Sequence, residues 1–191
     1  NLKGDLEDNE VYVFTPKGDV IILPDGATPL DFAYAIHTEV GHACIGAKVN
    51  GRLVPLGTTL HSGDTCEIFT SKVESAAPSR DWLQFVASPR ARNKIRQWFS
   101  RERRVDMIEA GREELTKEFR REGLPLQRIW DSKVLTDEIT ASSYADLDSV
   151  LAAIGEHHIS ARSIAQKVAR GFSQGADGEQ FSVVSPTRPD R

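Results

Sequence analysis

The sequence predicts a small α+β domain followed by an all-helical domain. Up to about residue 70, apolar residues form short β-rich runs separated by turn residues. Beyond residue 80 they recur at the i, i+3 and i+4 spacing of amphipathic helices. Residues 72–79 (KVESAAPS) lie between the two patterns and are typical of a linker. The chain has 191 residues, which is enough for two small domains.

Strands are expected wherever β-branched and aromatic residues cluster in the first region, at 11–14, 20–23, 44–49, 53–54 and 65–69. Pro16 and Gly18 lie between the first two runs, which predicts a hairpin. Asn50 and Gly51 separate the third run from the fourth, and this pair is the strongest hairpin signal in the chain.

One helix is expected between the second and third runs. Thr28 suits the N-cap, Pro29 the first helical position, and Asp31 the third, where it approximates a capping box. The helix should end by Gly41, a residue type common at helix C-termini. Two strands, a helix and three further strands within about sixty residues indicate an α+β fold of the ubiquitin-like β-grasp type. Composition alone leaves other small α+β folds open.

The remaining chain is expected to be helical. Ser79 can cap a first helix, Pro89 interrupts it, and a longer helix should run from about residue 91 to Gly123, with a break near Gly111. Shorter helical segments are expected at 126–130, 144–154 and 160–172. The predicted organisation is therefore a linker (1–9), a β-grasp domain (10–71), a linker (72–79), a helical domain (80–172) and a disordered tail (173–191).

Composition excludes several classes of protein. With 39% apolar and 27% charged residues, the chain is typical of globular proteins, and it has no apolar run of membrane-spanning length. It does not begin with Met, and its polar start (NLKGDLEDNE) is not a secretory signal, so we expect part of a longer cytoplasmic protein. A net charge of −4 argues against general polyanion binding. Cys44 and Cys66 have no metal-site spacing and are expected to be buried thiols.

The residues themselves resemble one family. The stretch VYVFTPKGDVIILPDGATPLDFAYAIHTEVGHACIGAKVNGRLVPL is similar to a TGS domain, the β-grasp module of threonyl-tRNA synthetases, certain GTPases and RelA/SpoT enzymes. The following segments PSRDWLQFV, ARNKIRQWF and AGREELTKEF resemble the helical region of RelA/SpoT-type (p)ppGpp synthetases/hydrolases. This resemblance covers about residues 10–172. A threonyl-tRNA synthetase would instead continue into an editing domain with His/Cys clusters.

The resemblance implies a regulatory fragment of a stringent-response enzyme. Family members carry a hydrolase domain with an HD metal site and a nucleotide pyrophosphokinase domain. This chain has neither a paired His-Asp metal motif nor a Gly-rich phosphate loop. We therefore expect no catalytic residue, metal or cofactor in it, and a role in controlling the catalytic domains of its parent protein. Whether that parent is a synthetase, a hydrolase or both stays open.

In RelA-like members the TGS domain is understood to hold the 3′-CCA end of deacylated tRNA on the ribosome. His42, expected to be exposed in a turn, is the first candidate for the terminal ribose hydroxyls. His37 is the reserve candidate, with capping of the helix C-terminus as its alternative role. Lys48, Arg52 and Lys17 are candidates for phosphate contacts, with ordinary solvated positions as the alternative.

A second basic surface is expected in the helical domain, where it would follow tRNA or ribosomal RNA. Its candidates are Arg90, Arg92, Lys94, Arg96, Arg103 and Arg104, with Arg101 close by. The alternative is an amphipathic helix with solvated charges, because Glu102, Asp106 and Glu109 partly neutralise the segment.

Two other functions stay open. The chain can act through protein–protein or intramolecular contacts, since the TGS domain of some family members is implicated in binding acyl carrier protein. It can also sense a regulatory nucleotide such as (p)ppGpp. Ribonuclease-insensitive complexes would favour the first, and stabilisation by a nucleotide would favour the second.

Overall fold

The computed structural model describes residues 9–176 and divides the chain into two units, 1–101 and 102–191. The division falls inside a long helix, so residues 80–101 belong with the N-terminal unit, whereas the sequence assigns them to the helical domain. The predicted linker 1–9 lies outside the described residues except for Asn9, whose carbonyl accepts a hydrogen bond from the Asp25 N–H.

The N-terminal unit contains two small sheets joined into a β-grasp arrangement. Strands β1 (Glu10–Phe14) and β2 (Val20–Pro24) form an antiparallel hairpin. The other sheet has the order β4-β3-β5, made of β4 (Arg52–Val54), β3 (Cys44–Val49) and β5 (Cys66–Thr70). A parallel bridge between Phe14 and Thr65 connects the two sheets. The α+β fold predicted from the sequence is confirmed.

The predicted turn chemistry is present. Asn50 and Gly51 both adopt positive φ, 52° and 80°, between β3 and β4. A two-residue hairpin loop with a type I′ turn requires positive φ at both central residues, and glycine adopts this conformation without a Cβ clash. The Asn50 side chain also bonds the Asp64 carboxylate and the Thr65 N–H, which fixes the loop before β5.

Two short helices replace the single helix expected up to Gly41. Helix α2 (Pro29–Ile36) begins with a complete capping box: the Thr28 hydroxyl accepts from the Asp31 N–H, and the Asp31 carboxylate accepts from the Thr28 N–H. His37 has extended backbone (φ −164°, ψ 145°), which ends α2, and α3 (Thr38–His42) follows at once. The sequence missed this break because His37 is not a helix-breaking residue type.

A buried carboxylate joins α2 to the segment that follows the β-grasp. Asp31 is 1% exposed, and its two oxygens also accept hydrogen bonds from the Ala87 N–H, the Ser88 N–H and the Ser88 hydroxyl, at 2.7–3.2 Å. The short 3₁₀ helix η1 (Arg80–Gln84) precedes this contact. Leu30, Ala33 and Tyr34 of α2 share a buried cluster with residues Val86, Ala91 and Ile95. Residues 86–95 are therefore fixed against α2.

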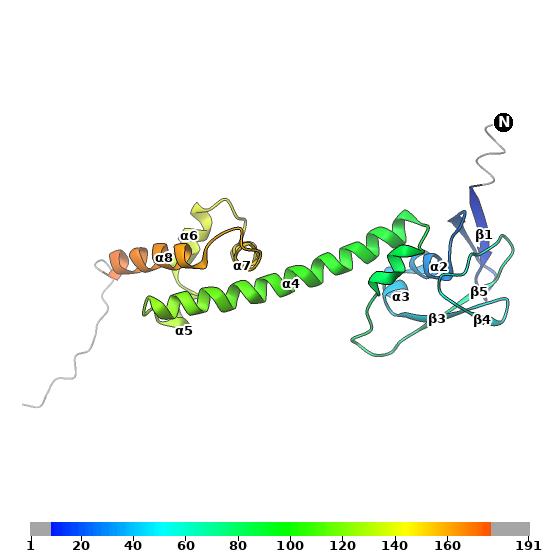
Figure 1. Ribbon diagram of the computed structural model, residues 1–191, viewed down its shortest axis with the longest axis horizontal. Helices are drawn as coiled ribbons and strands as arrows, with labels where there is room; N and C mark the ends of the chain where they lie inside the picture. Colours follow the sequence, from blue (N-terminus) through cyan, green and yellow to red (C-terminus); the bar gives the residue numbers. More distant parts are fainter. Residues whose placement is uncertain (1–8, 177–191) are drawn as a thin grey trace, which may run out of the picture. The chain divides into compact units, whose positions relative to one another are not determined.

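The C-terminal unit is helical and packs around the later part of α4 (Pro89–Arg121), beside which Figure 1 shows α6, α7 and α8. The other helices are α5 (Leu126–Ile129), α6 (Lys133–Ala141), α7 (Leu147–Gly155) and α8 (Ala161–Ala176). The sequence missed α6, and α8 continues past residue 172 to include the first residues of the predicted tail; 177–191 lie outside the described residues. No helix between residues 9 and 176 combines the length and apolar character that a bilayer span needs.

Helix α4 is continuous through Gly111, so the predicted break there is wrong. Gly111 instead permits a close crossing of two helices. A Cβ at Gly111 would overlap the backbone carbonyl of Leu151 in α7, and a Cβ at Gly155 would overlap the carbonyl of Met107 in α4. The two glycines thus let α4 and α7 approach at backbone contact.

We expect Gly111→Ala to destabilise the C-terminal unit by about 1–3 kcal/mol, because backbone atoms cannot move aside as a side chain can. Gly175→Ala in α8 is the matched control, since a Cβ there meets nothing within 4 Å. The control should stabilise its helix by up to about 1 kcal/mol. Urea unfolding followed by circular dichroism measures both changes, and equal effects of the two substitutions would contradict the crossing.

Candidate functional site

His42 lies at the C-terminal end of α3 and is buried, with 9% of its surface exposed. The prediction that it stands exposed in a turn is therefore wrong. Its Nδ1 is 2.9 Å from the Tyr34 hydroxyl, and the two rings meet edge to face with centroids 5.3 Å apart. The helix break at His37 turns α3 back toward α2 and brings these side chains together.

Gly41 is required by packing rather than by a helix end. It lies inside α3, and a Cβ on it would overlap the Tyr34 ring. Tyr34 itself is fully buried. The Tyr34 ring is thus confined by Gly41 on one side, which fixes the position of its hydroxyl beside His42.

The environment of His42 favours the neutral imidazole. Burial lowers its pKa below the ordinary 6.5, the charges of Arg101 and Lys94 lower it further, and Glu39 opposes this in part. Burial also raises the pKa of Tyr34, so its hydroxyl keeps its proton. When that proton is donated to Nδ1, Nε2 carries the other imidazole proton.

Nε2 of His42 has no hydrogen-bond partner among the described residues. No fully enclosed side-chain nitrogen or oxygen in residues 9–176 lacks a partner, so Nε2 reaches the surface. The small exposed part of His42 therefore includes a hydrogen-bonding atom. The arrangement can present one oriented N–H to a ligand.

His37 is exposed and caps the start of α3, whereas the sequence predicted that it would cap the end of the preceding helix. Its Nδ1 accepts a hydrogen bond from the Glu39 N–H, 3.0 Å away, at the start of α3. The expectation that it bonds the last carbonyls of α2 is corrected. Its remaining ring nitrogen is available to solvent.

The three predicted phosphate-binding residues of the β-grasp do not form one cluster around His42. Lys17 is exposed in the β1–β2 loop. Lys48 pairs with Leu53 across β3 and β4, whereas Arg52 pairs with Val49, so their side chains leave opposite faces of the sheet. Lys48 lies over the Phe69 ring, 5.6 Å from its centroid. The charges that act on His42 come instead from α4 and Glu39.

The predicted basic surface of α4 is divided between two faces. Positions 90, 94 and 101 recur at i, i+4 and i+11 and share one face of the helix, while 92 and 96 lie on another. Arg92 is held by a hydrogen bond to the Val86 carbonyl. Arg90 and Arg96 are exposed. The face of Lys94 and Arg101 is the one whose charge reaches His42.

Arg103 and Arg104 belong to the C-terminal unit and have partners there. The Arg104 guanidinium donates to the Ser149 hydroxyl at 3.2 Å, and Arg103 lies 3.9 Å from the Glu156 carboxylate. Both arginines remain exposed. These contacts connect α4 with α7.

Two family models match the chain. The model described as TGS domain matches residues 11–70, and the model described as RelA/SpoT AH domain matches residues 98–169. The GTP pyrophosphokinase of Streptomyces coelicolor is 56% identical over 190 residues, which are 98% of this chain and 22% of that protein. The "Bifunctional (p)ppGpp synthase/hydrolase RelA" of Mycobacterium tuberculosis is 54% identical over 88% of this chain and 23% of its own length.

The chain belongs to the RelA/SpoT family.

A more distant relative has the same relation to the chain. The GTP pyrophosphokinase of Escherichia coli is 42% identical over 187 residues, 96% of this chain and 24% of that protein. The chain thus spans about a quarter or less of the length of these relatives. The RelA/SpoT AH match agrees with the resemblance drawn from the residues and separates the chain from a threonyl-tRNA synthetase.

The cysteines of this RelA/SpoT chain are buried thiols, as predicted. Burial raises the pKa of Cys44 to about 11 and that of Cys66 to about 12, so neither is a thiolate at neutral pH. In the described part of the chain, no group of three or more His, Cys, Asp or Glu side chains could hold a metal ion.

Sequence reasoning missed Tyr34 as a part of the site. Its hydroxyl contacts a histidine eight residues later, which neither helical nor strand periodicity predicts. Arg101 was visible as one of several arginines, but its relation to His42 depends on how α4 packs on α2. Gly41, next to His42, was the available signal, because a residue that packs directly against an aromatic ring often has to lack a Cβ.

A lowered pKa of His42 makes stability depend on pH. The His42 imidazole takes up a proton near pH 6.5 in the unfolded chain but only at a lower pH in the folded chain. The free energy of unfolding should therefore fall as pH drops from 6.5 to the folded pKa, by up to about 1.4 kcal/mol per pH unit. NMR titration of the His42 ring checks the pKa, and His42→Gln should remove that part of the pH dependence. A His42 pKa at or above 6.5 would contradict the burial.

Proposed function

We propose that this chain is the regulatory region of a (p)ppGpp synthetase/hydrolase, in which the TGS domain recognises the 3′-CCA end of deacylated tRNA on the ribosome. Its response would be relayed to the catalytic domains of the same protein. The family membership and the activities for which the relatives are named support the regulatory part of this proposal. The tRNA part rests on the family resemblance and on the His42 site.

The observation that carries the proposal is the oriented, neutral imidazole of His42 beside cationic residues. Tyr34 holds Nδ1, and Nε2 reaches the surface without a partner in the described chain. Lys94 and Arg101 lie close enough for their charge to lower the His42 pKa, while the Glu39 carboxylate acts on it in the opposite direction. A ribose hydroxyl needs a hydrogen-bonding group of fixed orientation, and the neighbouring phosphate needs a cation.

Discrimination would follow from exclusion. An aminoacyl ester on the terminal ribose removes one hydroxyl and adds bulk beside His42. A site that hydrogen-bonds the free hydroxyl then has an unpaired buried group, which costs roughly 1–3 kcal/mol. Because only a small fraction of His42 is exposed, bulk water reaches only part of the ring and cannot fully replace the lost hydrogen bond.

The proposal is tested by the binding of one tRNA in three forms: deacylated, aminoacylated, and lacking its CCA end. We expect the deacylated, CCA-bearing form to bind about tenfold more tightly than either of the others. Affinity should fall as salt rises from low to physiological concentration, because phosphates are neutralised by Lys94 and Arg101. The same comparison with tRNA in a ribosomal A site extends the test to the assembly in which the end is presented. Equal binding of all three forms would refute the tRNA role.

Two variants locate the site in that assay. His42→Ala should abolish most of the preference for the deacylated form. His61→Ala is its control, because the His61 side chain is 79% exposed and lies in the loop before β5. Binding of guanosine tetraphosphate that competes with tRNA would instead support a nucleotide-sensing role for the same cations. An unchanged preference in His42→Ala would place the discrimination elsewhere.

A further inference from the structure

The hairpin β1–β2 has one covered edge and one open edge. On the covered side, the Phe14 N–H donates to the Asp64 carbonyl, the Gly63 N–H donates to the Tyr12 carbonyl, and the Tyr12 N–H donates to the Ser62 hydroxyl. Tyr12 and Phe14 therefore direct their backbone groups away from β2. In an antiparallel pair, two directly opposite residues that do not hydrogen-bond each other both direct their backbone N–H and C=O groups away from the partner strand.

The partners of Tyr12 and Phe14 in the register are Ile22 and Val20. Their N–H and C=O groups consequently point away from β1, at the outer edge of β2. Within residues 9–176 no other strand pairs with β2, and neither Val20 nor Ile22 has a backbone partner at that edge. This edge offers two N–H and two C=O groups to an added strand.

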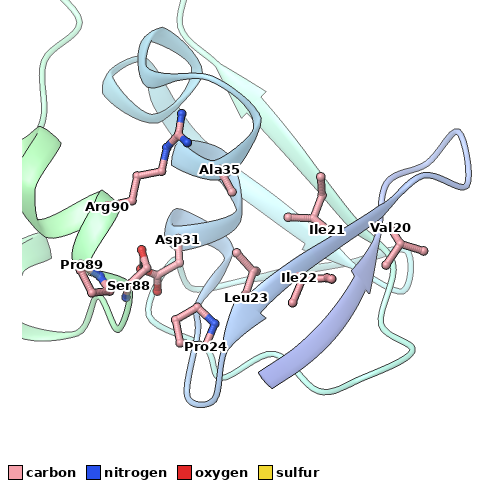
Figure 2. A pocket seen from close by; sticks show the side chains of 10 residues that line it. All are labelled: Val20, Ile21, Ile22, Leu23, Pro24, Asp31, Ala35, Ser88, Pro89 and Arg90. Atoms are coloured by element: carbon pink, nitrogen blue, oxygen red, sulfur yellow. Dashed lines mark hydrogen bonds between the residues drawn. The ribbon is translucent and has the colours of Figure 1, made fainter. Parts of the chain in front are cut away.

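The open edge borders a groove of about 550 Å³. Figure 2 shows β2 between β1 and the groove, with α2 and the start of α4 on the far side. Ile21, Leu23 and Ala35 give it apolar walls, and Pro89 closes one end. Val20 and Ile22 also line the groove at the strand edge; their side chains alternate to the face opposite Ile21 and Leu23 and are 48% and 56% exposed. A strand added to β2 would therefore find apolar surface on both of its faces.

The charge at the groove selects the kind of strand. Arg90 is exposed at the rim and has no acidic partner in the described chain. Asp31 also lines the groove, but its carboxylate is already bonded to Thr28, Ala87 and Ser88. One free cation beside apolar walls and open backbone groups suits an extended peptide that alternates apolar residues and carries a carboxylate.

Natural sheet edges are usually protected by charge, proline or a bulge. The edge of β2 has the sequence VIILP, with no charge and a proline only at its end, and its pairing with β1 shows no bulge. An exposed apolar edge of this kind promotes aggregation unless a partner strand pairs with it. Strand addition is a general mode of peptide recognition in which backbone bonds give affinity and alternate side-chain positions give specificity.

We propose that the outer edge of β2 binds an extended, acidic–apolar peptide segment by strand addition, with its carboxylate at Arg90. This surface is separate from His42, and the proposal does not depend on tRNA recognition. Pairing with β2 of a second copy of the chain is the alternative that the test below separates.

The test uses the chain and three capped heptapeptides. One alternates valine and threonine and carries a single glutamate, the second has lysine in place of glutamate, and the third is the glutamate peptide with N-methylated valines. We expect the glutamate peptide to shift the ¹⁵N–¹H resonances of Val20 and Ile22 and to slow exchange of their amide hydrogens. The lysine peptide should bind about two- to fivefold more weakly, as exposed ion pairs contribute little. The N-methylated peptide should not bind.

Variants of the chain complete the test. Val20→Pro removes the outward N–H at an edge position that tolerates proline, and it should abolish binding while the fold is retained. Arg90→Glu should reverse the preference between the two charged peptides, whereas Arg96→Glu, on another face of α4, should leave it unchanged. Three results would overturn the proposal: no response of Val20 and Ile22 at millimolar peptide, amides that are already protected in dilute free chain, or protection that grows with chain concentration alone. The last result would indicate pairing between copies.

Discussion

The buried carboxylate of Asp31 is the interaction on which the N-terminal unit depends. It accepts from the Thr28 N–H and hydroxyl at the start of α2, and from the backbone of Ala87 and Ser88 before α4. Burying a carboxylate is costly unless its oxygens accept hydrogen bonds. The donors of Thr28, Ala87 and Ser88 must therefore stay in place around Asp31. The start of α2 and the start of α4 are fixed to each other by this one side chain.

That constraint places the parts of the His42 site. Tyr34 comes from α2, and Lys94 and Arg101 come from α4. The break at His37 then returns α3 across α2, and Gly41 allows His42 to approach the Tyr34 ring. The result is a neutral imidazole whose Nδ1 is held by Tyr34 and whose Nε2 has no partner in residues 9–176, within reach of the charges of Glu39, Arg101 and Lys94. Such a group suits recognition of a hydroxyl next to a phosphate better than acid–base chemistry that needs a proton change near pH 7.

The sequence was informative where local chemistry decides the structure. The Thr28 cap, the Asn50-Gly51 turn and the apolar runs predict the β-grasp elements because each depends on neighbouring residues. The burial of His42, its contact with Tyr34 and the long-range bonds of Asp31 depend on packing between distant segments, which no local pattern contains. Gly111 shows the same limit: its sequence context suggests a helix break, whereas the reason for the glycine is the backbone of Leu151. Helix α6 was missed because its Thr and Asp residues weaken the helical signal.

The central proposal is that the surface beside His42 contacts the terminal ribose of tRNA. The most direct measurement is NMR mapping of the chain with a short RNA hairpin that ends in CCA, with either a free or an esterified 3′ end. The claim predicts that the His42 ring and the Tyr34 ring shift with the free end, together with resonances of Lys94 and Arg101, and that the esterified end leaves them unchanged. Shifts confined to the Lys48–Phe69 face of the sheet, or identical shifts with both RNAs, would contradict it.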